Sequence, residues 1–517
     1  MMDSKLLKRC MSFTFLFGIV AHAYGFFNFT ISHDSLEALY SGAAETEWKI
    51  SLGRIFVPVY RAVTRGMLTT PWMIGMLALV WIGLSVYFIV QLLGFTGSKF
   101  LIALTAGILT VNPVVTALTA TFLHDLDVDM FALLLMVLAV CLWKERKKGI
   151  FPGMCLIAVG LGLYQSYLSV AIALMMIVCI KDLLEGKRCN KVLLAGWKGI
   201  LLLSGGGLFY LILMEVICYF TGIPLSDSYN SISQLGNLSG SISELFWGTL
   251  KAYYYWLMYF LNPASMYSSK AVMAVNLLLG ICAAGIILTV FTEKKLGIAE
   301  KLLLVCLGGL LPLGMNLSSV LSGGMLHGLM MYSFCLIYLL ALFLGAWRCQ
   351  GAARKGAKVA RYVQIAMMGC VAFVIWNGIP VANAGYLKKD LERQQTLSLM
   401  TRVVMEMDKE EEYKRGETTV AFVGKIDMRE MPGFETFSGN GNTSGVQGLT
   451  ETDQIKNYRD YEAYFRYILN VPVKLCTEEQ RLDFWNRPEV EAMPVFPAEG
   501  SIEMVDGMMV IKMGEEY

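Results

Sequence analysis

The sequence predicts a polytopic α-helical membrane protein: about 11 transmembrane helices within residues 1–385, followed by a small extracytoplasmic α/β domain over residues 386–517. Of the 517 residues, 56% are hydrophobic and only 16% are charged, whereas soluble domains carry about 25% charged residues. The apolar residues also form runs long enough to cross the hydrocarbon core, which takes about 20 helical residues. After residue 386 these runs end and polar residues dominate.

The apolar runs predict the spans in order. Asn112-Pro113 should kink the third span, because proline cannot donate a backbone hydrogen bond. The apolar stretch 150–180 is too long for one span and is interrupted by Tyr164-Gln165-Ser166-Tyr167, so we expect two short helices hinged there. The expected spans are 11–29, 72–95, 100–118, a fourth that ends at 143, 192–220, 271–291, 302–321, 325–347 and 359–381, with an aromatic interfacial helix at 246–261.

The basic residues orient the chain. When successive loops are assigned alternately to the two sides, most lysines and arginines fall on the side of the N-terminus, which is therefore expected to be cytoplasmic. The C-terminal domain then lies outside. The first outer loop, residues 31–70, departs from this rule because it contains Lys49, Arg54, Arg61 and Arg65. Basic residues on the unexpected side are candidates for function.

Several classes of site are excluded. The 12 cysteines include no CxxC pair, and only Cys476 lies in the polar tail, so neither a disulfide framework nor a structural zinc site is expected. Gly205-Gly206-Gly207 is not followed by Lys-Ser/Thr, which excludes a P-loop. The net charge is only +2. We expect the bilayer as a partner and no nucleic acid.

The first outer loop carries the strongest functional signal. If it is helical, Asp34 and Glu37 share one face, and Arg61 and Arg65 share another. Acids and arginines held at a bilayer surface suit a lipid-linked phosphate substrate. Asp34 is then the candidate base, and Arg54 is the first choice for the phosphate, with Arg61 and Arg65 as helpers. The alternative is a solvated amphipathic helix whose charges pair with one another.

A second acidic cluster opens the fourth span. It contains Asp125, Asp127 and Asp129 beside His124. Acids in the first turn of a helix interact favourably with the helix dipole, which accounts for Asp125 and Asp127. Asp129 is expected to lie inside the membrane, where an ionisable residue is costly and is therefore a candidate for function. No cofactor is required, although with His33 nearby a divalent cation that bridges the two acidic clusters is an open alternative.

Two further regions complete the pattern. Tyr164, Gln165 and Tyr167 could hydrogen-bond a sugar, or they could satisfy backbone groups at the helix break. In the tail, the sequence predicts an amphipathic helix, short strands and a further helix. Their expected ranges are 387–413 for the first helix, 419–423, 471–475 and 508–513 for the strands and 458–469 for the second helix, with a Gly/Asn-rich loop at 439–448.

These motifs resemble a known family. Asp34 follows the first span, and Trp48 and the S-L-G-R of residues 51–54 come after it. Asn112-Pro113, the Asp-bearing start of the fourth span and Leu163-Tyr164-Gln165 follow in order. The order and spacing are similar to those of the bacterial Gtr-type membrane glucosyltransferases, the serotype-converting group that modifies O-antigen. The resemblance covers roughly the first 385 residues.

The resemblance implies a GT-C-like fold in a bacterial cell membrane and an inverting transfer of glucose. The donor would be polyprenyl-phosphate-glucose, and the acceptor would be a surface glycan such as O-antigen or teichoic acid on the outer face. Asp34 matches the first-loop acid of the family, where a pair of acids is common and this chain has His33-Asp34. Asp127 or Asp125 matches the acid of the fourth span. Candidate substrate-binding residues are Arg54, Glu37, Trp48, Arg61, Arg65, Tyr164 and Gln165.

Two other functions remain in view. One is a GT-C transferase of another sugar. The other, from a different class, is a flippase or transporter of lipid-linked sugars. A transporter tends to keep its charges near the bilayer midplane and to show paired halves. Here no internal repeat is evident and the acids gather at the expected outer surface, which favours the enzyme.

Overall fold

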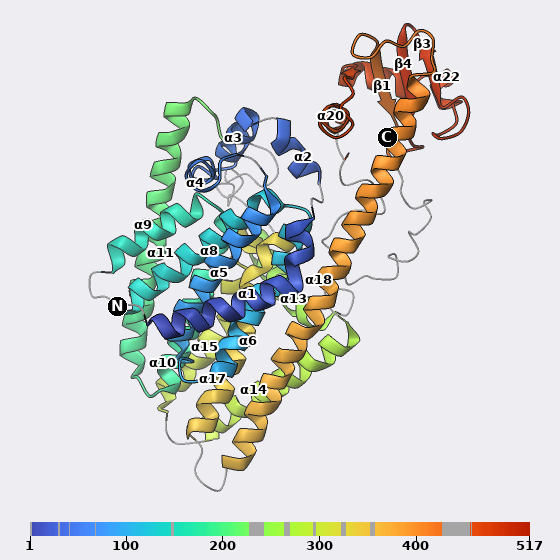
Figure 1. Cartoon of the computed structure of the whole chain (residues 1–517). Coiled ribbons are helices and arrows are strands. Elements are labelled where there is room, and N and C mark those ends of the chain that lie inside the picture. Colours follow the sequence, from blue (N-terminus) through green and yellow to red (C-terminus); the bar gives the residue numbers. More distant parts are fainter. Residues whose placement is uncertain are drawn as a thin grey trace.

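The structure is a computed structural model, and it is mostly helical (Figure 1). It describes residues 3–28, 32–40, 42–67, 69–145, 149–226, 242–262, 269–292, 296–321, 327–351, 357–426, 455 and 458–516. The predicted Gly/Asn-rich loop at 439–448 lies outside these residues.

The first half of the chain forms the helices nearest the site. They are α1 (Ser4–Phe27), α2 (His33–Tyr40), α3 (Gly42–Ser51), α4 (Val57–Thr64), α5 (Pro71–Leu93), α6 (Lys99–Thr110), α7 (Pro113–Ala120), α8 (Leu123–Glu145), α9 (Ile150–Leu161), the short 3-10 helix η1 (Gln165–Tyr167), α10 (Leu168–Leu184) and α11 (Cys189–Thr221). The second half of the bundle consists of α13 (Ile242–Leu261), α14 (Lys270–Thr292), α15 (Ile298–Met315), α16 (Leu317–Leu321), η2 (Gly328–Cys335), α17 (Leu336–Gly351) and α18 (Ala357–Met407).

Nine helices of the described residues are long and apolar enough to cross a membrane, or ten if the bent pair α6–α7 counts as one span. A polytopic helical membrane protein is therefore confirmed, whereas the predicted number of about 11 spans is not. Part of the difference is α9, which has 12 residues and so rises only about 18 Å, against a hydrocarbon core of about 30 Å.

Both predicted breaks in the spans are present. Asn112 caps α7 with its side chain, which accepts a hydrogen bond from the Val114 amide, and Pro113 is the first residue of that helix. The axes of α6 and α7 meet at 42°. The second break separates α9 from η1, where Tyr164 has extended backbone angles. Its backbone groups stay hydrogen-bonded across the break: the amide donates to the Gly160 carbonyl at 3.0 Å, and the carbonyl accepts from the Tyr167 amide at 3.3 Å.

Helix α8 is the centre of the bundle. It packs against α5, α9 and α10, and 83% of the residues in its apolar membrane-spanning stretch are buried. By contrast, α11 and α14 expose most of their apolar residues, as expected of helices at the lipid-facing edge. The acids at the start of α8 are therefore fixed to the most rigidly packed element of the fold.

The long helix α18 leaves the bundle and carries the α/β unit (Figure 1). It has 51 residues and a length of about 76 Å, more than twice the thickness of the hydrocarbon core. It passes residue 385 without a break, so the structure joins the last span and the helix that were expected to be separate. The helix continues through Pro380 and Gly385, which favour a break, because tertiary packing holds it there: Ala382 and Tyr386 are fully buried against the bundle.

The C-terminal unit contains a four-stranded sheet in the order β2-β1-β4-β3. Strand β1 is parallel to both β2 and β4, and β3 is antiparallel to β4. The elements are β1 (Thr419–Val423), α20 (Tyr458–Ala463), the π-helical turn η5 (Tyr464–Ile468), β2 (Lys474–Leu475), α21 (Glu478–Trp485), α22 (Pro488–Glu491), β3 (Ile502–Val505) and β4 (Met508–Lys512). The predicted strands and helix are present, whereas β3 was not predicted.

One helix of the first outer loop packs against this unit. Leu36 of α2 is fully buried in the same apolar cluster as Met400 of α18 and Tyr464 of η5, and α2 contacts α20. Helix α2 is thus held between the bundle and the C-terminal unit. Asp34 lies two residues before this anchor.

We expect Leu36→Ala to loosen α2, because removing a buried leucine side chain costs about 2–5 kcal/mol of packing free energy. Hydrogen exchange of the α2 amides should become faster, and the activity should fall with it. Leu482→Ala is the matched control, since Leu482 is an exposed leucine of α21. Unchanged exchange in α2 would show that Leu36 does not anchor this helix.

Candidate active site

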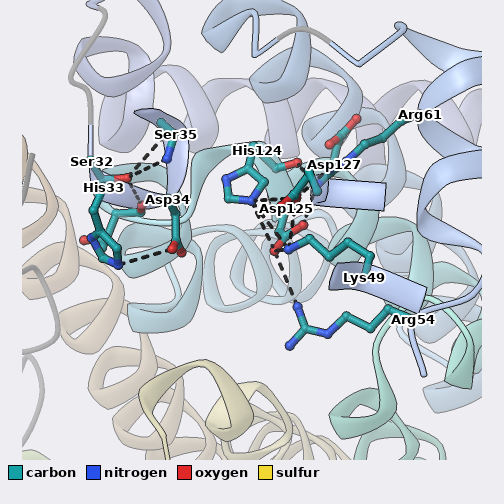
Figure 2. Close-up of polar contacts among 12 residues, drawn as sticks. Ser32, His33, Asp34, Ser35, Lys49, Arg54, Arg61, His124, Asp125 and Asp127 are labelled. Carbon is teal, nitrogen blue, oxygen red and sulfur yellow. Dashed lines mark hydrogen bonds and ion pairs between the residues drawn. The ribbon is translucent and has the colours of Figure 1, made fainter. Parts of the chain in front are cut away.

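The candidate site lies where the first outer loop meets the start of α8 (Figure 2). Helices α2, α3 and α4 cover this end of the bundle, which is also the end toward which α18 carries the α/β unit (Figure 1). The fold therefore brings together the two acidic clusters that are far apart in the sequence.

Asp125 is the hub of a buried ion-pair network. Its carboxylate oxygens lie 2.7 Å from Lys49 Nζ and 2.6 Å from Arg61 Nη2. Glu45 completes the network, with Oε1 3.0 Å from Arg61 Nη1 and 3.4 Å from Lys49 Nζ. The alternative reading of this loop was a solvated helix whose charges pair with one another. The charges of Glu45, Lys49 and Arg61 do pair, with α8 as well as with one another, but their side chains are buried.

Glu45 is a member of the site that the sequence analysis did not single out, and Lys49 was noted there only as one of four basic residues on the unexpected side. They lie four residues apart on α3, and this spacing was the available signal. Burial raises the pKa of Glu45, but the charges of Lys49 and His124 outweigh this effect and hold it well below its usual range. Glu45 is therefore an anion at neutral pH.

Arg65 and Asp127 form a second, separate pair. Arg65 Nε lies 2.8 Å and Nη2 lies 3.3 Å from the two oxygens of Asp127, and both side chains are fully buried. Arg65 Nη2 also donates to the His124 carbonyl at 2.7 Å. Successive arginines at the end of α4 thus bind successive acids of α8, which fixes the loop on the bundle.

We expect Arg65→Met to lower the stability of the protein by about 3–5 kcal/mol, because it leaves the Asp127 carboxylate buried without its partner. The double variant Arg65→Met/Asp127→Leu should recover much of this loss, since it removes both charges. Thermal unfolding of the detergent-purified proteins measures the difference. Equal unfolding temperatures for the single and double variants would contradict a coupled pair.

Arg54 differs from the other two arginines. The only hydrogen bond of its side chain among the described residues is a long one, 3.5 Å from Nη1 to Asp125 Oδ2. The guanidinium carbon stands 4.5 Å above the centre of the Tyr164 ring. The side chain is 18% exposed, compared with 2% for Arg61. Arg54 therefore keeps N–H donors that a ligand could use.

The loop that carries Arg54 is held by Gln165 and Tyr210. The Gln165 amide donates to the Leu52 carbonyl at 3.1 Å and to the Tyr210 hydroxyl at 3.2 Å. That hydroxyl donates to the Gly53 carbonyl at 2.9 Å, and Gly53 has a left-handed φ of 77°, which favours glycine. Gln165 thus satisfies backbone groups, the second of its two expected roles, while sugar binding by Gln165 stays a prediction.

Asp34 stands apart from the ion pairs around Asp125 (Figure 2). It is paired with its neighbour, His33 Nε2, at 3.2 Å, and its side chain is 28% exposed. The Ser32 hydroxyl donates to the Thr121 carbonyl, which ties the start of α2 to the start of α8. Burial raises the pKa of Asp34, but the hydrogen bond and charge of His33 and the charges of His124 and Lys49 hold it below its usual value. Asp34 is therefore an accessible, ionised carboxylate.

Two other predicted residues are less informative. Trp48 of α3 is 47% exposed, and no ion pair or aromatic contact of the described residues involves it. Glu37 belongs to α2, and its side chain lies outside the described part of the chain.

A metal ion does not fit well among these residues. Within the described part of the chain, one group of potential ligands gathers closely, namely Glu45, His124 and Asp125, with ligand atoms within 4.8 Å of one another. The Lys49 ammonium already lies 2.7 Å from Asp125 and 3.5 Å from His124 Nε2. An ion would have to displace it. The expected alternative of a divalent cation stays a prediction.

Comparison with known proteins decides the family. The model of the family Glucosyl transferase GtrII matches residues 23–344, more than half of the chain. The chain belongs to this family. The resemblance to Gtr-type enzymes is thereby confirmed, and the protein is a glycosyltransferase of the GtrII group.

The matched region includes every residue of the candidate site and ends within α17. It does not include α18 or the C-terminal unit. No curated protein and no solved structure matches the chain. The GT-C-like fold implied by the resemblance stays a prediction.

Proposed function

We propose that this GtrII-family protein transfers glucose from polyprenyl-phosphate-glucose to a glycan on the outer face of a bacterial cell membrane, with inversion at the sugar carbon. One observation carries the proposal: at the end of the bundle, the side chains of Asp34 and Arg54 are 28% and 18% exposed, whereas Arg61, Arg65, Asp125 and Asp127 are held in buried ion pairs. An accessible carboxylate and an arginine with spare donors are the groups that this reaction needs.

In the proposed reaction, an acceptor hydroxyl attacks C1 of the glucosyl group. The Asp34 carboxylate takes the hydroxyl proton as the new bond to C1 forms, and the bond from C1 to the phosphate oxygen breaks. The leaving group is polyprenyl phosphate, whose developing charge Arg54 stabilises through two parallel N–H donors. No metal or other cofactor is required for this step.

Asp125 and Asp127 have an indirect role in this proposal. Their carboxylates accept from Lys49, Arg61 and Arg65, so they fix the loop that presents Arg54 and are not free to accept a proton. The distribution of basic residues supports a cytoplasmic N-terminus, and in this proposal the active end of the bundle faces outward together with the C-terminal unit.

The test is sugar transfer by the purified full-length protein. The donor is synthetic polyprenyl-phosphate-glucose, and the acceptor is isolated surface glycan, with polyprenyl-phosphate-mannose as the comparison donor. Inverted glucosyl linkages formed from the glucose donor support the proposal. Transfer from the mannose donor alone would instead indicate a transferase of another sugar.

A transporter of lipid-linked sugar is the alternative class. The same protein reconstituted in vesicles distinguishes the two. Movement of the labelled donor from one leaflet to the other, without transfer to the acceptor, would overturn the proposed reaction and make the outer loop a gate.

A further inference from the structure

Asp129 lies one helical turn below Asp125, inside the bundle. The two residues are four positions apart on α8 and therefore share a face of this helix. Asp129 is only 3% exposed, and its carboxylate has no hydrogen-bond partner among the residues that the structure describes. A buried carboxylate without such partners is costly, so a residue of this kind is expected to have a function.

Tyr167, in the short helix η1, is a second buried group without a partner among the described residues. Its ring is 1% exposed, and its hydroxyl forms no hydrogen bond within the described part of the protein. Buried tyrosine hydroxyls usually have one. The short helix η1, which carries Tyr167, packs against α8, which carries Asp129. Two unsatisfied groups of complementary chemistry thus gather at one place.

Arg54 and Tyr164 connect this place to the candidate phosphate site. The Tyr164 ring contacts both Arg54 and Tyr167. Its centre is 4.5 Å from the Arg54 guanidinium carbon and 5.8 Å from the centre of the Tyr167 ring. Arg54 Nη1 also lies 3.5 Å from Oδ2 of Asp125, which is one helical turn before Asp129 on α8. A ligand whose phosphate binds Arg54 would therefore extend its next group toward Tyr167 and Asp129.

We propose that Asp129, Tyr164 and Tyr167 form the subsite that binds the hexose of the lipid-linked donor, an inference that rests on the proposed function. The hexose is joined directly to the phosphate, so it must occupy the space next to Arg54. Its hydroxyl groups donate hydrogen bonds to the Asp129 carboxylate and accept one from the Tyr167 hydroxyl. Both unsatisfied groups gain partners only when the sugar is bound, so the subsite adds affinity for sugar-bearing lipid and none for lipid phosphate alone.

The test compares two ligands on the purified full-length protein in nanodiscs. They are a short-chain polyprenyl-phosphate-glucose and the same polyprenyl phosphate without sugar. Tyr167→Phe removes only the hydroxyl, and Asp129→Asn keeps the shape of the side chain but replaces one accepting oxygen with an NH2 donor. Tyr332→Phe is the matched control, because the ring of Tyr332 packs 5.5 Å from that of Tyr167 while its hydroxyl donates to the Leu109 carbonyl instead.

We expect Tyr167→Phe to raise the Kd for the glucose-bearing lipid by roughly 3- to 10-fold and Asp129→Asn to raise it by about 10-fold or more. Neither should weaken binding of polyprenyl phosphate, and Tyr332→Phe should change neither Kd. Wild-type affinity for the glucose-bearing lipid in both variants, or an equal loss for both ligands, would overturn the subsite. So would a wild-type protein that does not bind the glucose-bearing lipid.

Transfer measured on the same samples separates this inference from the proposed function. Selective loss of sugar binding in the variants, with no transfer by the wild type, would leave the subsite in place and overturn the proposed reaction. Transfer by the wild type with unaltered binding in the variants would support the proposed reaction and overturn the subsite.

Discussion

Asp34→Asn is expected to reduce glucosyl transfer by about 10²–10⁴-fold, the range typical of losing a general base. The amide has nearly the same shape as the carboxylate but cannot take the acceptor proton. Because the Asp34 side chain is 28% exposed and has no arginine partner among the described residues, the fold and the level of membrane-inserted protein should not change. Initial rates with polyprenyl-phosphate-glucose measure the loss.

The control for this variant is Asp483→Asn in α21, whose side chain is 62% exposed. It should transfer glucose at the wild-type rate. If well-expressed Asp34→Asn protein also transferred glucose at the wild-type rate, Asp34 would not be the general base. Loss of membrane-inserted protein in Asp34→Asn would show that His33 and Asp34 serve folding instead.

Arg54→Lys is expected to lower kcat by roughly 10- to 100-fold, because an ammonium is a point charge and cannot reproduce two parallel bonds to a phosphate. Lysine also loses the stacking of the guanidinium on Tyr164, which lies 4.5 Å away. Product inhibition by polyprenyl phosphate should weaken together with kcat, since the same donors bind the leaving group. Both quantities come from one set of transfer assays.

Arg402→Lys is the matched control, since Arg402 is an exposed arginine of α18. Wild-type rates and unchanged product inhibition for Arg54→Lys would mean that a positive charge beside Asp125 is sufficient. Arg54 would then be one more member of the ion-pair network rather than a phosphate ligand.

Much of the membrane architecture was predictable because it follows from local properties of the chain. Runs of apolar residues gave α1, α5, α8 and α11, and Asn112-Pro113 gave the bend between α6 and α7. The uninterrupted course of α18 was not predictable from composition, since the change from apolar to polar residues near 386, with Pro380 and Gly385 beside it, favours a break, and only the burial of Ala382 and Tyr386 in the folded protein holds the helix through it. Strand β3 was missed because Ile502–Val505 is only four residues long and gains its pairing from β4.

The sequence by itself determined that this is a membrane protein with acids and arginines in its first outer loop, and that its motifs resemble those of Gtr-type enzymes. It could not tell Arg54, Arg61 and Arg65 apart, because an arginine is available to a ligand only if no carboxylate of the protein already binds it. Their partners, Asp125 and Asp127, lie 62 to 71 residues away along the chain. Only the packing of α3 and α4 on the start of α8 decides which arginine is neutralised and which is left open.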